Sequence, residues 1–359
     1  MRTCIDRHLI IPGLEHIQAE PDCRRLIDAL LKRGIPERVP FMELIFDDGV
    51  LERILQRPIA GFGDVAEAHL RLGYDTVSVR ISPAFSRVYH KAENTASLAQ
   101  GQRDWAMSSS GLIRDRSDFE RYPWPEVDAS IIEMMESAGR ILPEGMGTTL
   151  RSSGILDNLI KVMSYEGLCE TLYDDPDLIK DISDVIGNLL VRTFEQVIDC
   201  ERVVGVFFGD DLGFRTSTLI APKHLRTYVF PWLKRLVDVA HSRGKIAILH
   251  CCGYVESVME GLISDVGIDA KHSFEDAIEP VTSFKARYGD RIGVVGGIDM
   301  DVLARSTPEA VAAYTRKVLD ECAPSGGYAL GTGNSVANYI PIENYFAMLK
   351  EGWNFRIHR

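Results

Sequence analysis

A histidine and a cysteine two positions apart form the pair of residues best suited to chemistry in this sequence. His250 and Cys252 follow the apolar run "KIAIL" and precede a glycine that opens a loop. Residues two apart in an extended strand leave the same face, so Cys251 is expected to point the other way. Imidazole nitrogen and thiolate sulfur are ligands that suit Zn²⁺. Packing of a hydrogen-bonded histidine and buried thiols is the alternative interpretation.

A zinc site of this kind needs a third protein ligand and, if it is catalytic, one open coordination position. The candidates for that ligand are Asp210, Asp211, His272 and Glu43, each of which ends an apolar run. Asp210 and Asp211 are also candidates for a catalytic acid, and one of them could instead cap the turn that follows. Glu43 is a further catalytic candidate.

Strands that alternate with helices are the elements expected to position these residues. Eight apolar or β-branched runs recur between segments of helical periodicity, at 38–46, 75–80, 147–154, 202–211, 245–253, 267–274, 291–299 and 327–335. This count predicts an α/β fold, a (β/α)8 TIM barrel formed by residues 1–359 as a single domain. In a barrel the carboxyl ends of the strands meet at one mouth, which would gather the candidate residues there.

Two segments fall outside this alternation. Residues 1–24 form an N-terminal extension, and residues 83–126, with the sequence Pro-Trp-Pro, form an insertion after the second strand that could serve as a lid. The aromatic residues Phe46, Trp105, Tyr122 and Trp124 could stack on an aromatic substrate, with ordinary packing as the alternative.

Composition excludes several classes of function. The net charge of −12 argues against a nucleic acid or an anionic membrane as a partner, because both need a basic surface. No apolar run approaches the roughly 20 residues of a membrane span, and the N-terminus lacks the apolar region of a signal peptide, so we expect a cytoplasmic protein. Dinucleotide, phosphate-loop and serine-hydrolase motifs are absent from the sequence.

Several motifs together resemble the uroporphyrinogen decarboxylase superfamily. They are "RVPFMELIFDD", "DFERYPWP", "DDLGF", "LHCCGYV", "GGIDMDVLARSTPEAV" and "GGYALGTGNSVANYIPIENYFAML", and they cover about residues 25–353. The resemblance implies a (β/α)8 barrel. The decarboxylases of this superfamily have an arginine-rich segment after the first strand and a "GHG" after the last, where this chain has "FMELIFDDG" and "GTGNS". These differences argue against decarboxylation.

The second branch of the superfamily comprises corrinoid-dependent methyltransferases, and "LHCCG" looks like their zinc motif. This resemblance implies that His250 and Cys252 bind zinc, while Asn334 stands where the enzymes that methylate coenzyme M have a cysteine. The motifs "DDLGF" and "GTGNSVANYIP" look more like the methoxyl-cleaving components of anaerobic O-demethylase systems. This likeness implies zinc-dependent methyl transfer from an O-methyl compound to the Co(I) corrinoid (cobalamin) of a partner protein, and a homodimer is one expectation for the assembly. The substrate would contact Arg80, His272, Asn334 and Phe46.

Two other activities are alternatives to this prediction. One is methyl transfer from a methylcorrinoid to a thiol, and the other is a lyase activity like that of uroporphyrinogen decarboxylase. Zinc would distinguish the two transfer reactions from the lyase.

Overall fold

A curled parallel sheet of seven strands is the centre of the computed structural model, which describes residues 5–86, 89–91, 104–106 and 111–357. In sheet order the strands are β1 (Thr76–Arg80), β4 (Gly147–Ser153), β5 (Val203–Gly209), β6 (Ile246–His250), β7 (Ala270–His272), β8 (Gly293–Val295) and β9 (Tyr328–Ala329). Because every neighbouring pair is parallel and follows chain order, all carboxyl ends lie at one edge, as the sequence predicted.

The first predicted strand, 38–46, differs from the other seven. It makes only isolated parallel bridges, Phe41 to Leu330 and Phe46 to Val336, on the far side of β9. Pro40 lies within it and has no N–H to donate to a ladder. Among the described residues no ladder joins this segment to β1, but its Glu43 accepts a hydrogen bond from the Tyr74 hydroxyl, 3.3 Å away and just before β1. The sheet is therefore curled and barrel-like. Between segment 38–46 and β1, a hydrogen bond between side chains takes the place of a backbone ladder.

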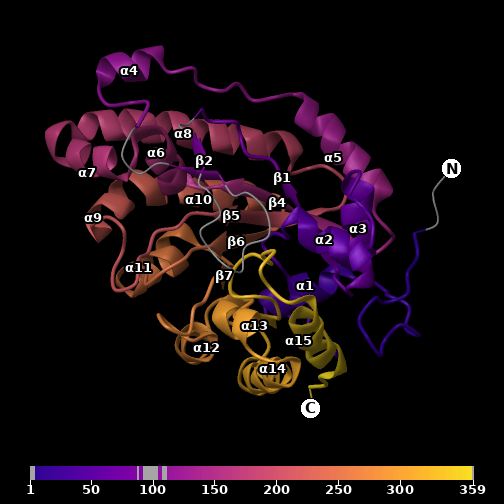
Figure 1. Cartoon of the computed structure of the whole chain (residues 1–359). Helices are drawn as coiled ribbons and strands as arrows, with labels where there is room; N and C mark the ends of the chain where they lie inside the picture. The colour runs from indigo at the N-terminus through magenta and orange to yellow at the C-terminus, as the bar shows by residue number, and fades with distance from the viewer. Residues whose placement is uncertain (1–4, 87–88, 92–103, 107–110, 358–359) are drawn as a thin grey trace.

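Helices lie around the outside of this sheet (Figure 1). Those in the first half are α1 (Cys23–Leu30), α2 (Asp48–Leu55), α3 (Phe62–Arg71), α4 (Arg116–Arg121), α5 (Ser130–Ile141), α6 (Ile155–Met163), α7 (Tyr165–Asp174) and α8 (Pro176–Val197). Those in the second half are α9 (Pro222–His224), α10 (Phe230–His241), α11 (Glu256–Gly261), α12 (Val281–Tyr288), α13 (Met300–Arg305), α14 (Pro308–Cys322) and α15 (Ile342–Asn354), with π-helical turns η1 (Leu225–Val229) and η2 (Leu262–Val266).

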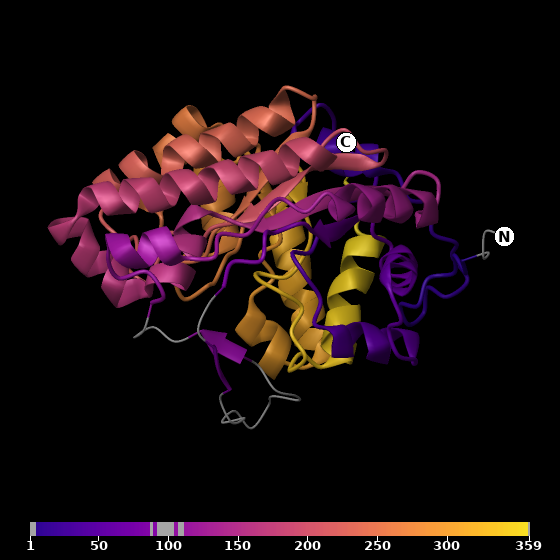
Figure 2. The same ribbon diagram turned by 90° about the horizontal axis from the view of Figure 1, so that it is seen from above.

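Helix α8 illustrates how the sequence determines these elements. The Asp175 side chain accepts the Leu178 N–H, and Pro176 occupies the first helical position, where its missing N–H costs nothing. Apolar residues recur at three- and four-residue intervals along its length and are buried. Figure 2 shows this long helix running along one side of the molecule.

The interior of the curled sheet is a small core separate from the main one between sheet and helices. Phe207 of β5, Ile248 of β6 and Ala329 of β9 meet there, together with Leu26 and Leu30 of α1. Side chains two residues further along β5 and β6 must therefore emerge on this inner face, beyond the core, at the carboxyl edge.

The insertion 83–126 includes the antiparallel pair β2 (Tyr89–Lys91) and β3 (Asp104–Ala106), followed by α4. Residues 87–88, 92–103 and 107–110 lie outside the described residues, as does the Trp105 side chain, so the predicted lid stays a prediction. Tyr122 packs on Trp124 with ring centroids 4.6 Å apart, and its hydroxyl donates to the Ser86 carbonyl. Among the described helices, none has the length and apolar character to cross a membrane.

Candidate functional site

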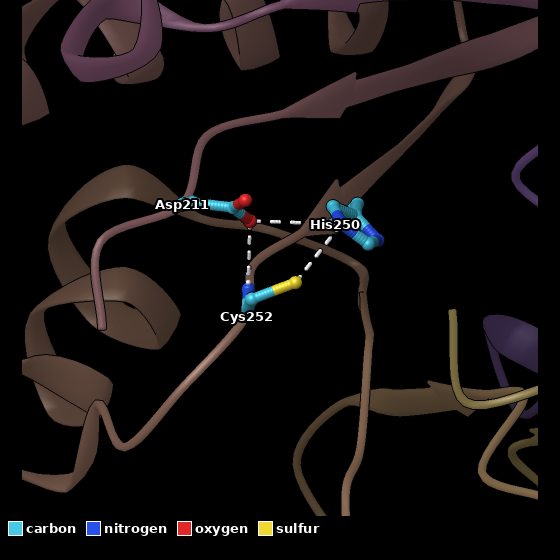
Figure 3. A group of neighbouring side chains, drawn as sticks. All are labelled: Asp211, His250 and Cys252. Atoms are coloured by element: carbon cyan, nitrogen blue, oxygen red, sulfur yellow. Dashed lines mark hydrogen bonds and ion pairs between the residues drawn. The ribbon is translucent and has the colours of Figure 1, made fainter. Parts of the chain in front are cut away.

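Asp211, His250 and Cys252 form the group of side chains that the carboxyl edge brings together (Figure 3). The Cys252 Sγ lies 3.4 Å from His250 Nε2, and the Asp211 Oδ1 lies 3.6 Å from the same nitrogen. Asp211 Oδ1 also accepts the Cys252 N–H at 3.0 Å. Cys251 is fully buried on the other side, where its sulfur accepts the Leu212 N–H, so the predicted alternation of the two cysteines is confirmed.

Two neighbouring loops hold this group. His250 is the last residue of β6 and pairs in register with Gly209, the last residue of β5. Beyond the strand ends the two loops touch backbone to backbone, because a Cβ on Gly213 would lie 2.7 Å from the Cys252 carbonyl oxygen. Gly253, with a positive φ of 79°, makes the matching turn in the other loop. This contact places Asp211 beside Cys252.

The two donor-atom separations from His250 Nε2 fit a zinc ion, and all three donor atoms lie within 4.8 Å of one another. Around tetrahedral zinc, with bonds of about 2.0–2.1 Å to nitrogen or oxygen and about 2.3 Å to sulfur, nitrogen lies about 3.6 Å from sulfur and about 3.3 Å from oxygen. The observed separations are 3.4 Å and 3.6 Å. Three protein ligands would leave the fourth position open, as in catalytic zinc sites.

A chain of hydrogen bonds fixes the tautomer of His250. The Thr332 carbonyl oxygen lies 3.1 Å from His272 Nε2 and can only accept, so that nitrogen donates. In a neutral ring the His272 Nδ1 is then an acceptor, and His250 Nδ1, 2.7 Å away, donates to it. Burial lowers the pKa of His250 to about 3 and that of His272 well below its usual value, so both rings are neutral. The lone pair of His250 Nε2 therefore faces Cys252 and Asp211.

The electrostatics around the sulfur also suit a cation. Burial, and then the Asp211 carboxylate, raise the pKa of the Cys252 thiol. A divalent cation reverses this balance, because it favours the deprotonated thiol. The Ser273 hydroxyl lies 3.2 Å and the Asn334 amide nitrogen 3.4 Å from the sulfur, so both are placed to hold it in position.

Asp210, which the sequence offered as a ligand or catalytic acid, lies outside this group, whereas Asp211 belongs to it. The Asp210 carboxylate is fully buried and accepts the N–H groups of Ile155, Leu156 and Asp157. These are the first residues of α6, whose free N–H groups need an acceptor. Asp210 therefore caps a neighbouring helix, because alternate residues after β5 point in opposite directions. The sequence had left open which of the two aspartates has this role.

Glu43 and His272 lie outside the group and orient His250 through a chain of hydrogen bonds. Glu43 is buried, with Oε1 accepting the Thr332 N–H at 3.0 Å and Oε2 accepting the Thr332 hydroxyl at 2.6 Å. Burial raises the pKa of Glu43 to about 8. Since Thr332 in turn accepts from His272, Glu43 orients the end of the histidine chain.

The other residues expected to contact the substrate are Arg80, Phe46 and Asn334, and they lie in different surroundings. Arg80 ends β1 on the inner face of the sheet and is exposed. Phe46 is buried in edge-to-face contact with Tyr74 and Tyr345, which is packing rather than a substrate surface. Asn334 lines a cleft of about 790 Å³ whose other walls include Asp276, Asp299, Asp301 and Tyr339. This cleft adjoins the sulfur that Asn334 contacts.

Ser273 was missed by the sequence analysis, since a serine after a short strand gives no signal by type or spacing.

Comparison with known proteins identifies relatives over most of this region. A family model for uroporphyrinogen decarboxylase (URO-D) matches residues 112–352. Uroporphyrinogen decarboxylase of an Azoarcus species is 26% identical over 187 residues, which are 50% of this chain and 49% of that protein, so the match spans about half of its length. The same enzyme of Methylobacillus flagellatus is 22% identical over 251 residues, covering 66% of this chain and 68% of that protein.

Solved structures share the fold at low identity. A methyltransferase from Methanosarcina mazei superposes with a TM-score of 0.67 at 16% identity, covering 93% of this chain and 98% of that one. A B12-independent methionine synthase from a Shewanella species gives a TM-score of 0.50 at 10% identity, covering 89% of this chain and 97% of that one. These likenesses concern the fold, whereas the family model covers more than half of the sequence. The chain belongs to the uroporphyrinogen decarboxylase (URO-D) family.

Proposed function

We propose that this protein is a zinc-dependent methyltransferase that moves a methyl group from an O-methyl compound to the Co(I) corrinoid of a partner protein. The observation that supports this most is the spacing of the Asp211, His250 and Cys252 donor atoms, which fits a three-ligand zinc site with an open position. The structural likeness to the Methanosarcina methyltransferase is consistent with it.

His250 Nε2, Cys252 Sγ and Asp211 Oδ1 would hold the zinc ion. Bound there, zinc supplies a Lewis acid that makes an ether oxygen a better leaving group. The protein's own residues orient the reactants. Thr332 and His272 keep the His250 lone pair directed at the site, and Asn334 and Ser273 fix the position of the sulfur. Of the two aspartates, Asp211 is the one placed to act either as the third ligand or, instead, as proton donor to the leaving oxygen, because the Asp210 carboxylate accepts hydrogen bonds from the start of α6.

A decarboxylase activity is the second candidate, because the family model and both curated relatives carry that name. The residues argue for the first candidate. The segment "FMELIFDDG" has Glu43, Asp47 and Asp48 where the decarboxylases have an arginine-rich segment, so the arginines that bind the substrate carboxylates in those enzymes are absent from this position. Transfer from a methylcorrinoid to a thiol uses the same zinc chemistry and differs in the acceptor.

Metal analysis and a transfer assay test the proposal together. The purified protein should contain about one equivalent of zinc, and His250→Ala and Cys252→Ala should each lose it. His16→Ala and Cys200→Ala are matched controls, because neither residue belongs to the Asp211–His250–Cys252 group and both variants should keep the metal. With reduced corrinoid protein and a methoxylated phenol, methyl–cobalt absorbance should appear only with the zinc-containing forms.

The results that oppose the proposal are equally specific. A protein that holds no zinc and converts uroporphyrinogen is a decarboxylase. Methyl transfer from a methylcorrinoid to a thiol, with no transfer from the methoxylated phenol, would assign the alternative methyltransferase reaction.

A further inference from the structure

Two arginine side chains stand next to each other on the inner face of the sheet. Arg80 of β1 and Arg151 of β4 are register partners at the carboxyl ends of neighbouring parallel strands, which are about 4.8 Å apart. Two residues earlier, the Ser78 and Thr149 hydroxyls hydrogen-bond to each other across the same pair of strands at 2.9 Å. Residues two apart share a face, so both arginine side chains leave the sheet on the same side.

That side is the one on which the candidate metal group lies. Arg151 pairs in register with Phe207 of β5, and Phe207 pairs with Ile248 of β6. Phe207 and Ile248 belong to the core inside the curled sheet, and His250 follows Ile248 by two residues. Arg151 therefore lies on the same inner face of the sheet as His250.

No carboxylate in the described part of the chain balances the positive charge of this arginine pair. Among the described residues, no ion pair joins Arg80 or Arg151 to a carboxylate, and the Nε of Arg151 is buried with no hydrogen-bond partner. Burial, and then the charge of Arg80, lower the pKa of Arg151 to about 10. An unpartnered buried donor and two adjacent like charges are both unfavourable unless a ligand satisfies them.

The opposite end of β1 shows how the chain balances such a pair elsewhere. Arg25 and Arg38 converge on the buried carboxylate of Asp75, one residue before β1, and Arg38 Nη2 lies 3.3 Å from Asp75 Oδ1. The two arginines at the amino end of β1 share a carboxylate. Among the described residues, the two arginines at the carboxyl ends of β1 and β4 have no such carboxylate. The missing acceptor at the carboxyl end is the position that a ligand can fill.

Lys271, the other buried cation near the group, is already satisfied. Its Nζ donates to the Ser273 carbonyl at 2.6 Å and lies 4.2 Å from the centroid of the Phe274 ring. It alternates with Ala270 and His272, so it points to the outer side of the sheet. Lys271 therefore does not compete with the arginine pair, whose donors face the inner site.

We propose that Arg80 and Arg151 bind an oxyanion group of the substrate, a carboxylate or a phosphate, and hold its reactive end at the Asp211–His250–Cys252 group. The guanidinium forks match either anion in bidentate geometry. As a statement about substrate class, this inference rests on the proposed methyltransferase function. The binding of an anion at these two residues does not depend on it.

Binding measurements on the full chain, with and without zinc, test the proposal. The probes are 3-methoxybenzoate, 3-methoxyphenyl phosphate and, as a neutral compound of similar shape, 3-methoxytoluene, each followed by titration calorimetry. At least one anion should bind roughly 10- to 100-fold more tightly than the neutral compound, the range that charge-assisted hydrogen bonds give. The tighter anion identifies whether the group is a carboxylate or a phosphate.

Variants assign the effect to the residues. Arg151→Gln and Arg80→Gln should each reduce the preference for the anion roughly 10-fold or more, and Arg151→Lys should restore part of it by returning the charge. Arg140→Gln is the control, because Arg140 is a surface residue of α5 with 67% of its side chain exposed. Equal affinity of the unaltered protein for the neutral compound and both anions would overturn the proposal without any variant. So would correctly folded glutamine variants that keep the full preference.

The two proposals fail in different ways. Arginine-dependent binding of the benzoate without any methyl transfer would leave the anion site standing and refute the methyltransferase function. Methyl transfer from 3-methoxybenzoate or 3-methoxyphenyl phosphate, with the same KM in the unaltered protein and in Arg151→Gln, would keep the function and refute the anion site.

Discussion

Replacement of His272 by phenylalanine tests the tautomer chain behind the metal group. The ring of His272 is fully buried, 5.5 Å from the Phe207 ring in an edge-to-face arrangement, so phenylalanine keeps the shape and loses both nitrogens. His250 Nδ1 then has no acceptor at 2.7 Å. Its ring must either bury an unpaired N–H or move the proton to Nε2, which removes the metal ligand.

The expected loss follows from the cost of that unpaired donor. A buried, unsatisfied N–H costs about 1–3 kcal/mol, which corresponds to roughly a 5- to 150-fold weaker metal affinity. Loss of an outer hydrogen-bond partner of a zinc-binding histidine typically costs about 10- to 100-fold, in agreement with this range. Zinc affinity measured by competition with a chromophoric chelator provides the assay.

His272→Gln is the matched variant for this experiment. A glutamine can accept from His250 with its oxygen and donate to the Thr332 carbonyl with its nitrogen, so zinc affinity should stay within a few-fold of the original. Thermal unfolding of the metal-free proteins reports any loss of packing separately. Equal zinc affinity in the phenylalanine variant, or equal losses in both variants, would show that the hydrogen bond does not set the tautomer.

The two adjacent aspartates and the buried glutamate give three further expectations. Asp211→Asn should lower zinc affinity at least 10-fold with little change in the stability of the metal-free protein, as chelator competition would reveal. Asp210→Asn should instead lower the free energy of unfolding by about 1–2 kcal/mol, measured in urea, and leave one equivalent of zinc bound, because an NH2 group replaces one of the two oxygens that accept the first N–H groups of α6. Since burial raises the pKa of Glu43 to about 8, the folded state holds a proton that the unfolded state releases above about pH 4.5. Stability should therefore fall between about pH 4.5 and 8, by on the order of a few kcal/mol, and Glu43→Gln should flatten this dependence in denaturation measured across that range.

Sequence periodicity was sufficient to predict seven of the eight strands, because most of them are apolar or β-branched runs that a parallel sheet buries on both faces. It failed at segment 38–46, which forms isolated bridges instead of a hydrogen-bond ladder. Pro40 has no N–H to donate there, and the Glu43 side chain accepts the Thr332 N–H. The pair His250 and Cys252 was predictable since it lies within one strand and alternation is a local property. The third member was not, because Asp210 and Asp211 are equivalent in composition and differ only in the direction in which they leave the end of β5.

The arginine pair and the metal group depend on non-local information in the same way. Arg80 and Arg151 are 71 positions apart and become neighbours only through the register of β1 with β4. Asp211 reaches Cys252 only because Gly213 and Gly253 let two loops approach to backbone contact, where a Cβ on Gly253 would lie 2.3 Å from the Gly213 carbonyl carbon. Side chains at either glycine would push the loops apart and separate the carboxylate from the thiol. The ligand types are thus provided by individual strand ends, while their distances are determined by glycines that take no part in the chemistry.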